Sequence, residues 1–110
     1  EFHKDLDTTK ANMIIRKGYR KQIDSYSAFY ENDKKTMTGL DGFLKQNNIK
    51  KVYLCGLALD FCVYYSAIDA KTLGYDTYVI LNATKAINLD GSKNKSLQDM
   101  ESKNVNLIHL

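Results

Sequence analysis

The chain has 110 residues, the size of one ordinary domain, and its hydrophobic fraction of 44% is enough to build a core. The net charge of +3 comes from basic residues in scattered pairs, without the concentrated basic face that nucleic-acid binding requires. No apolar run is long enough to span a membrane, and no leader of the secretory type is visible. We therefore expect a cytoplasmic protein with no nucleic-acid or membrane partner, whose two cysteines are reduced thiols.

The first predicted element is a buried strand in "ANMIIRKG", where the apolar trio Met13, Ile14 and Ile15 stops at Gly18. This strand delivers Lys17 to its C-terminal end. The following stretch, residues 19–35, is polar, aromatic and rich in turn formers, so it is predicted to be a loop with at most a short helix. A helix capped by Thr38 is expected to run through Lys45.

The remaining elements alternate between strand and helix patterns. The longest predicted helix runs from Asp60, a candidate N-cap, to Gly74, which suits the left-handed position after the last turn. A later helix begins at Ser92 or Ser96. Three further strands are predicted at residues 50–56, 75–82 and 105–110. This alternation favours parallel βαβ units with helices packed on the faces of the sheet.

In such sheets, ligands bind beyond the C-terminal ends of the strands, near helix N-termini. That rule points to the loop after Lys17 and to residues 56–62. Cys62 lies two residues after the candidate N-cap, in the first turn, where unpaired N–H groups and the helix dipole favour a thiolate and hence a nucleophile. Its placement alone leaves a catalytic and a structural role equally open.

The other groups that could take part in chemistry are fewer. Cys55 lies inside a strand and is expected to be a core-filling thiol. His109 lies in the last apolar strand and is expected to be structural, and His3 has no obvious partner. Lys17 ends a buried strand at the same sheet edge as Cys62, where a cation would stabilise a thiolate and an oxyanion. A lysine that simply reaches solvent is the alternative.

Several motifs together resemble a known family. "GLALDFCV" (residues 56–63) resembles the nucleophile motif of the isochorismatase-like cysteine hydrolases. "RKG" followed by "DSYSAF" resembles the lysine strand and pocket loop of their nicotinamidase/pyrazinamidase branch, and the lead-in "EFHKDLD" is similar as well. The stretch from Ala58 to Ile87 resembles the family's helix, next strand and loop, so the resemblance covers nearly the whole chain.

The resemblance implies an α/β fold, a three-layer parallel sheet with helices on both faces and Rossmann-like topology. It also implies a catalytic set of Asp, Lys and Cys, in which Cys62 matches the nucleophile and Lys17 the lysine. The family has a cis peptide bond that here would join Leu57 to Ala58, and an oxyanion hole made by the N–H groups of Ala58 and Cys62. The implied reaction is hydrolysis of nicotinamide to nicotinate and ammonia through a Cys62 thioester.

Three aromatic residues are candidates for the pocket that holds the pyridine ring. Tyr26 and Phe29 lie in the "DSYSAF" loop, and Phe61 precedes the nucleophile. For each of them, ordinary core packing is an equally open alternative.

The sequence also departs from the family pattern. The catalytic aspartate and the ligands of the divalent metal (zinc, iron or manganese) lie in segments before anything present here, and neither Asp5, Asp7 nor Asp24 matches that aspartate. We therefore expect residues 1–110 to be the C-terminal portion of one hydrolase domain, with the N-terminal strands missing and no metal site of its own. On this hypothesis the 110 residues alone are inert.

Two other functions stay open at this point. A different hydrolase of the superfamily would act on isochorismate, a carbamoyl compound or a ureide, but the "DSYSAF" loop favours nicotinamide. A non-catalytic module would bind a partner through the exposed sheet edge, and retention of both Lys17 and Cys62 counts against it. A homo-oligomer is compatible with either enzyme.

Overall fold

A computed structural model describes residues 27–30 and 37–110 of the chain. The predicted strand at residues 11–17 and most of the following loop lie outside the described residues. Seven elements follow one another in the described part. They are helix α1 (Leu40–Gln46), strand β1 (Lys51–Leu57), the π-helical turn η1 (Leu59–Val63), helix α2 (Tyr64–Thr72), strand β2 (Asp76–Lys85), helix α3 (Ser92–Ser102) and strand β3 (Asn106–Ile108).

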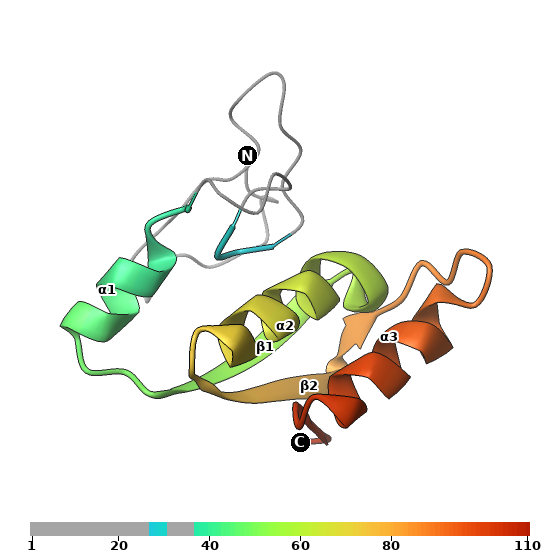
Figure 1. Cartoon of the computed structure of the whole chain (residues 1–110). Helices are drawn as coiled ribbons and strands as arrows, with labels where there is room; N and C mark the ends of the chain where they lie inside the picture. The colour runs from blue at the N-terminus through green and yellow to red at the C-terminus, as the bar shows by residue number, and fades with distance from the viewer. Residues whose placement is uncertain (1–26, 31–36) are drawn as a thin grey trace, which may run out of the picture.

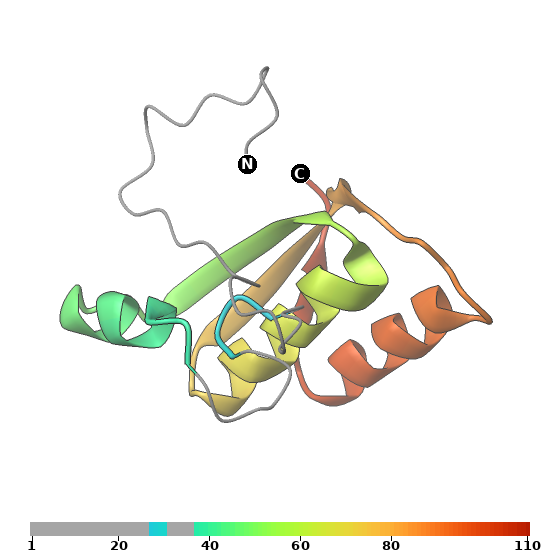
Figure 2. The same cartoon turned by 90° about the horizontal axis from the view of Figure 1, so that it is seen from above.

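The three described strands form one parallel sheet in the order β1-β2-β3. Each strand is paired with the next one along the chain, so each connection carries a helix back across the sheet, as the alternating pattern predicts. Figures 1 and 2 show that α2 and α3 lie on the same side of the sheet. The described residues thus supply one of the two helical layers that the family resemblance implies.

The main core lies between this sheet face and the two helices. β2 contributes Val79, which is fully buried, and α3 contributes Met100, which is also fully buried. Alternate residues of a strand point to opposite faces, so Val52 and Leu54 of β1 face the same helical layer. The burial of apolar side chains from β2, α2 and α3 in one cluster fixes both helices on the sheet.

The opposite face of β1 is not covered by the described residues. Tyr53 is 53% exposed and Leu57 is 74% exposed, and the ring of Tyr53 stacks on Tyr78 of β2 with centroids 4.8 Å apart. Cys55 lies on this face and is exposed. The expectation that Cys55 fills the core is therefore wrong for the described part of the chain. The strand pattern correctly placed it inside a strand, but a thiol is buried only on a face that another layer covers.

A smaller cluster joins α1 and the residues 27–30 to the start of β2. Phe29 is 1% exposed, and its ring stacks on Tyr75 with centroids 5.8 Å apart. Leu40 and Leu44 of α1 pack against the same pair. The predicted helix is confirmed as α1, but its N-cap is Gly39 and no side chain caps it, so the expectation that Thr38 caps the helix is wrong. Thr38 instead precedes the N-cap and accepts a hydrogen bond from the N–H of Leu40 at 3.3 Å.

Candidate active site

Cys62 lies at the junction between the C-terminal end of β1 and helix α2. The chain leaves β1 at Leu57, and the peptide bond from Leu57 to Ala58 is cis, at the position where the family resemblance places one. The turn η1 follows at once, and the N–H of Val63 donates to the carbonyl of Ala58, five residues earlier, at 3.1 Å. Single π-helical turns often occur at functional sites, and this one carries the candidate nucleophile.

Asp60 does not cap the helix, contrary to the sequence prediction. It lies inside η1, whose N-cap is Ala58, and no side chain forms a capping hydrogen bond there. Asp60 is only 3% exposed, and its carboxylate accepts hydrogen bonds from a loop that follows β2. A carboxylate at a helix start usually accepts from its own first turn, but here the partners come from residues that are distant in sequence.

The bonds to Asp60 stabilise its charged form. The N–H of Ile87 donates to Oδ1 at 3.0 Å, and the N–H of Asn88 donates to Oδ2 at 2.6 Å. The hydroxyl of Ser92 also donates to Oδ2, at 2.5 Å. Burial acts to raise the pKa of Asp60, but the bonds from Ser92 and the backbone N–H groups outweigh it, so the pKa is below its ordinary value. Asp60 is therefore an anchoring carboxylate.

Two cavities meet at Cys62. One has a volume of about 210 Å³ and is mostly apolar; it is lined by Ala58, Phe61, Cys62, Ile87 and Leu89. The other has a volume of about 310 Å³ and is lined by Ala28, Leu54, Cys55, Gly56, Leu57, Cys62, Val63 and Ser66. Cys62 thus faces space on two sides, at the C-terminal edge of a parallel sheet, where such sheets bind ligands.

The three predicted aromatic pocket residues separate in the structure. Phe61 lines the 210 Å³ cavity beside Cys62, where a pocket wall was expected. Phe29 is buried against Tyr75 and Ala70, so in the described residues it takes the alternative role of core packing. Tyr26 and the candidate catalytic Lys17 lie outside the described residues.

The loop that contains Phe29 nevertheless reaches the helix of the nucleophile. The N–H of Ala28 donates to the hydroxyl of Ser66 at 2.7 Å, and Ser66 is buried in α2. Ser27 accepts from the N–H of Phe29 at 3.1 Å, which holds the turn in shape. Because Ala28 and Ser66 both line the 310 Å³ cavity, the described residues 27–30 form one side of the space next to Cys62.

Sequence reasoning missed Ile87 and Leu89 as candidate site residues. Both side chains are large, apolar and exposed, at 57% and 62%. They follow β2 in a loop, where apolar side chains beside Asn88 and Asp90 give no local signal of a site. The signal that was available is the position itself, since this loop also leaves the C-terminal end of a parallel strand.

Comparison with known proteins identifies the family. The family model for the isochorismatase domain matches residues 1–110. This chain belongs to the isochorismatase family. A nicotinamidase from Acinetobacter baylyi is 49% identical over 108 residues, which are 98% of this chain and 50% of that protein. The chain spans about half the length of the curated nicotinamidases it matches.

Solved structures agree with the fold of this isochorismatase-family chain. A nicotinamidase/pyrazinamidase from Acinetobacter baumanii superposes with a TM-score of 0.95 at 50% identity, covering 99% of this chain and 53% of that chain. The PnC1 protein from L. infantum, solved in complex with nicotinate, gives a TM-score of 0.90 at 36% identity and covers 97% and 53%. The predicted α/β class with a parallel sheet is confirmed.

The described residues of this isochorismatase-family chain offer no metal site. They contain no group of three or more His, Cys, Asp or Glu side chains that could hold an ion. A pyrazinamidase from Pyrococcus horikoshii was solved in complex with zinc; it is 27% identical with a TM-score of 0.81, covering 96% of this chain and 55% of that chain. A divalent metal therefore occurs in the family, but the described residues do not fit one.

Other expectations concern groups away from Cys62. His109 is exposed and lies just after β3, which ends at Ile108, so the expectation that it lies inside the last strand is wrong, and its structural role stays a prediction. His3 lies outside the described residues. Within the described ranges, no helix has the length and apolar character needed to cross a membrane.

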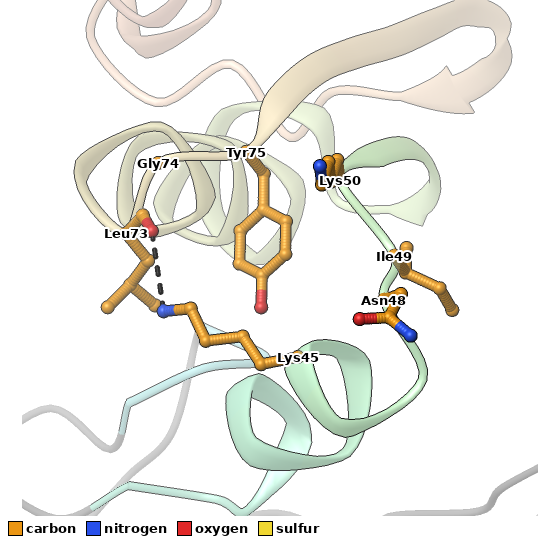
Figure 3. A pocket seen from close by; sticks show the side chains of 7 residues that line it. All are labelled: Lys45, Asn48, Ile49, Lys50, Leu73, Gly74 and Tyr75. Atoms are coloured by element: carbon orange, nitrogen blue, oxygen red, sulfur yellow. Dashed lines mark hydrogen bonds between the residues drawn. The ribbon is translucent and has the colours of Figure 1, made fainter.

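A further cavity lies at the opposite, N-terminal edge of the sheet. It has a volume of about 210 Å³, and Figure 3 shows Lys45 reaching across it from α1 toward the carbonyl of Leu73. Lys50 and Tyr75, which also line it, immediately precede β1 and β2. The cavity is thus remote from Cys62 and on the side where parallel sheets seldom bind substrates.

Proposed function

We propose that this chain is the part of a nicotinamidase that carries the nucleophile, and that the full-length protein hydrolyses nicotinamide to nicotinate and ammonia. The observation that carries the proposal is the placement of Cys62 on a π-helical turn at the C-terminal edge of the sheet, facing an apolar cavity. The similarity to nicotinamidases over almost all of the chain supports the same substrate.

In the first half of the proposed reaction, the Cys62 thiolate attacks the carboxamide carbon of nicotinamide. A carbon–sulfur bond forms, and the negative charge moves to the carboxamide oxygen. The N–H groups of Ala58 and Cys62 are proposed to hold this oxyanion, and Lys17 is proposed to favour the thiolate. The carbon–nitrogen bond then breaks, and ammonia leaves with a proton from the family's aspartate, which lies outside this sequence.

In the second half, water attacks the thioester. The family's aspartate, left deprotonated by the first half, takes one proton from this water and so regains its acid form, while the second proton passes to solvent or to the released ammonia. A carbon–oxygen bond forms and the carbon–sulfur bond breaks, which gives nicotinate and returns Cys62 to the thiolate. Phe61 supplies an aromatic wall for the pyridine ring, and Tyr26 is proposed to supply another. We expect the divalent metal of the full-length enzyme to be bound by residues outside this chain, and no step above depends on it.

The test is ammonia release from nicotinamide by the full-length protein. Cys62→Ala should abolish turnover, because the thioester cannot form; a loss of at least about a thousandfold is expected for a covalent nucleophile. Cys55→Ala is the matched control, since it removes the other thiol, and it should retain activity. Turnover that survives Cys62→Ala would refute the mechanism.

The choice of substrate is tested by the same assay. Activity on a ureide or a carbamoyl compound, with none on nicotinamide, would support the second hydrolase hypothesis. Absence of turnover of any of these amides would favour the non-catalytic module. The 110-residue chain alone is expected to release no ammonia, because the family's aspartate is not in it.

A further inference from the structure

We infer that Asp60 is a positioning residue that holds the loop of residues 86–91 against Cys62, so that Ile87 and Leu89 form the wall that selects a flat aromatic amide. The inference rests on the proposed function and deepens it, since it assigns the substrate specificity of the same site. Three sets of contacts carry it: those of the carboxylate, those of the loop, and those of the cavity.

The first set binds consecutive backbone groups of the loop to one carboxylate. Asp60 accepts directly from the N–H groups of Ile87 and Asn88, at 3.0 and 2.6 Å. The next N–H, that of Leu89, donates to the hydroxyl of Ser92 at 2.8 Å, and this hydroxyl donates to Asp60. One buried carboxylate therefore fixes three successive N–H groups, two directly and one through Ser92.

The second set shows that the loop needs such an anchor. Asn88 and Asp90 both have positive φ, at 60° and 50°, so the loop reverses direction through left-handed positions that are not glycine. Asn and Asp adopt left-handed positions more readily than other non-glycine residues, but two of them in one short loop still carry a conformational cost that the surrounding contacts offset. The side chain of Asn88 adds one contact, accepting from the N–H of Lys93 at 3.3 Å, but Asp60 supplies the buried charge.

The third set explains what the anchored loop does. A fixed backbone at Ile87, Asn88 and Leu89 turns alternate side chains to the same side, and both Ile87 and Leu89 line the cavity of Cys62 and Phe61. Their exposed fractions of 57% and 62% are large for apolar side chains. Covering exposed apolar side chains with an apolar ligand lowers the free energy, because apolar surface is removed from water. A planar aromatic ring has a shape that can lie against Ile87 and Leu89 in this way.

The arrangement has a direct consequence for specificity. Asp60 precedes Cys62 by two residues in η1, so the turn that positions the nucleophile also positions the opposite wall. Nicotinamide presents a ring to this wall, whereas a small aliphatic amide such as acetamide does not. Loss of the wall should therefore weaken use of nicotinamide and leave any slow reaction with acetamide nearly unchanged.

The experiment compares three pairs of variants in the full-length protein. Asp60→Asn keeps the size of the side chain but removes an acceptor, and Asp90→Asn makes the same change at an exposed position of the same loop. Ser92→Ala cuts the link to Leu89, and Ser92→Thr keeps the hydroxyl. Ile87→Ala shortens the wall itself, and Ile49→Ala removes the same atoms at an exposed position remote from Cys62.

The expected results separate positioning from general destabilisation. Asp60→Asn should raise KM for nicotinamide by roughly tenfold or more while kcat falls less, because the ring loses its wall and the nucleophile stays in place. Ser92→Ala and Ile87→Ala should do the same to a smaller degree. Asp90→Asn, Ser92→Thr and Ile49→Ala should match the unsubstituted protein, with folding of every variant checked by thermal unfolding.

A second measurement does not depend on turnover. Iodoacetamide alkylates exposed thiolates, and mass spectrometry of the peptide that contains Cys62 gives the rate at this thiol. Asp60→Asn should raise this rate, because the loop no longer shields Cys62, and nicotinate should protect Cys62 less than in the unsubstituted protein. If the protein never hydrolyses nicotinamide, the proposed function fails, and the rate of alkylation still tests the loop.

Two outcomes would overturn the inference. One is an Asp60→Asn variant that folds, keeps the KM for nicotinamide and shows an unchanged alkylation rate at Cys62. The other is a Ser92→Ala variant that lowers the unfolding temperature but leaves KM and protection by nicotinate as they were. Either result would mean that the Asp60 contacts stabilise the fold but do not position the wall of the site.

Discussion

Tyr75 connects two segments of the described structure through its hydroxyl group. Its side chain is 3% exposed, and the hydroxyl donates to Oδ1 of Asp41 at 2.6 Å. Asp41 lies in the first turn of α1 and pairs with Lys45, so Tyr75 attaches α1 to the start of β2. The hydrogen bond from Tyr75 lowers the pKa of Asp41; burial opposes this, and Lys45 adds to it, so the pKa stays below its ordinary value.

The contribution of this hydroxyl can be measured with Tyr75→Phe in the full-length protein. The variant leaves a buried carboxylate short of a donor, and hydrogen bonds to charged groups contribute about 1.5–3 kcal/mol, so a loss of that order is expected in the free energy of unfolding. Urea denaturation gives the value. Tyr53→Phe is the matched control, since Tyr53 is 53% exposed, and it should change stability by less than about 0.5 kcal/mol. Equal effects of the two changes would contradict the assignment.

Helix α3 is held by its buried residues Ser96 and Met100, by Leu97, which packs against the core, and by the polar contacts of Asp99. Met100 is fully buried in the main core. Next to it, Asp99 accepts from the hydroxyl of Tyr64 at 2.6 Å and pairs with Lys103. The remaining surface of α3 is mostly polar, so its position on the sheet depends on these few residues.

We therefore predict that Met100→Ala weakens the attachment of α3. Truncation of a fully buried methionine costs about 2–5 kcal/mol, because transfer energy is lost and a cavity remains. Met100→Leu keeps most of the volume and should cost less than about 1.5 kcal/mol. Urea unfolding measures both, and hydrogen exchange of α3 amides should rise in the first variant. A similar cost for the two substitutions would mean that packing volume does not hold α3.

The elements were predictable where local pattern and tertiary role coincide. Strand β1, helix α3 and the left-handed Gly74, with φ of 98°, lie where apolar pattern and turn residues placed them. The π-helical turn was not predictable, because its sequence reads as an ordinary first helical turn. The hydrogen-bond partners of Asp60 could not be predicted either, because they lie in a loop after β2 that is distant from Asp60 in the sequence.

At the scale of the whole molecule, the candidate site was located by a general rule and a motif together. The rule about parallel strands indicates the sheet edge at which the structure places Cys62, and the motif indicates Cys62 within that edge; its catalytic role stays a prediction. Burial was harder to predict, and Cys55 shows why: strand residues alternate between faces, and the sequence does not say which face receives a helical layer. Exposure of His109 likewise depends on where β3 ends.

The charged groups of the described residues predict how stability depends on pH. The pKa values of Asp41, Asp60 and Asp99 are all below their ordinary values in the folded chain. As the pH falls below about 4, these carboxylates take up protons in the unfolded chain before they do so in the folded chain, so the unfolded chain binds more protons. Stability should therefore be fully present above about pH 4 and fall as the pH drops further. Urea midpoints measured from pH 3 to pH 7 test this, and a flat profile would contradict it.

The alkaline side follows from the tyrosines with the opposite sign. Burial, followed by the hydrogen bond to Asp41, raises the pKa of Tyr75 to about 12. Burial, followed by the hydrogen bond to Asp99, also raises the pKa of Tyr64. Above about pH 10 the unfolded chain releases phenolic protons that the folded chain keeps, so stability should decline as the pH rises through the folded values. Tyr75→Phe should lessen this decline, which absorbance of ionised tyrosine and urea midpoints can follow together.

The sequential strand order described above also bears on how the nucleophile comes to be in place. Every described pairing joins a strand to the next strand along the chain, β1 to β2 and β2 to β3. Contacts between segments that are near in sequence form early, because little loop-closure entropy opposes them. The turn that carries Cys62 lies within the unit β1-α2-β2, and the loop that Asp60 holds leaves the end of the same unit. The nucleophile and its apolar wall can therefore assemble as one folding unit, before more distant parts of a polypeptide have to dock.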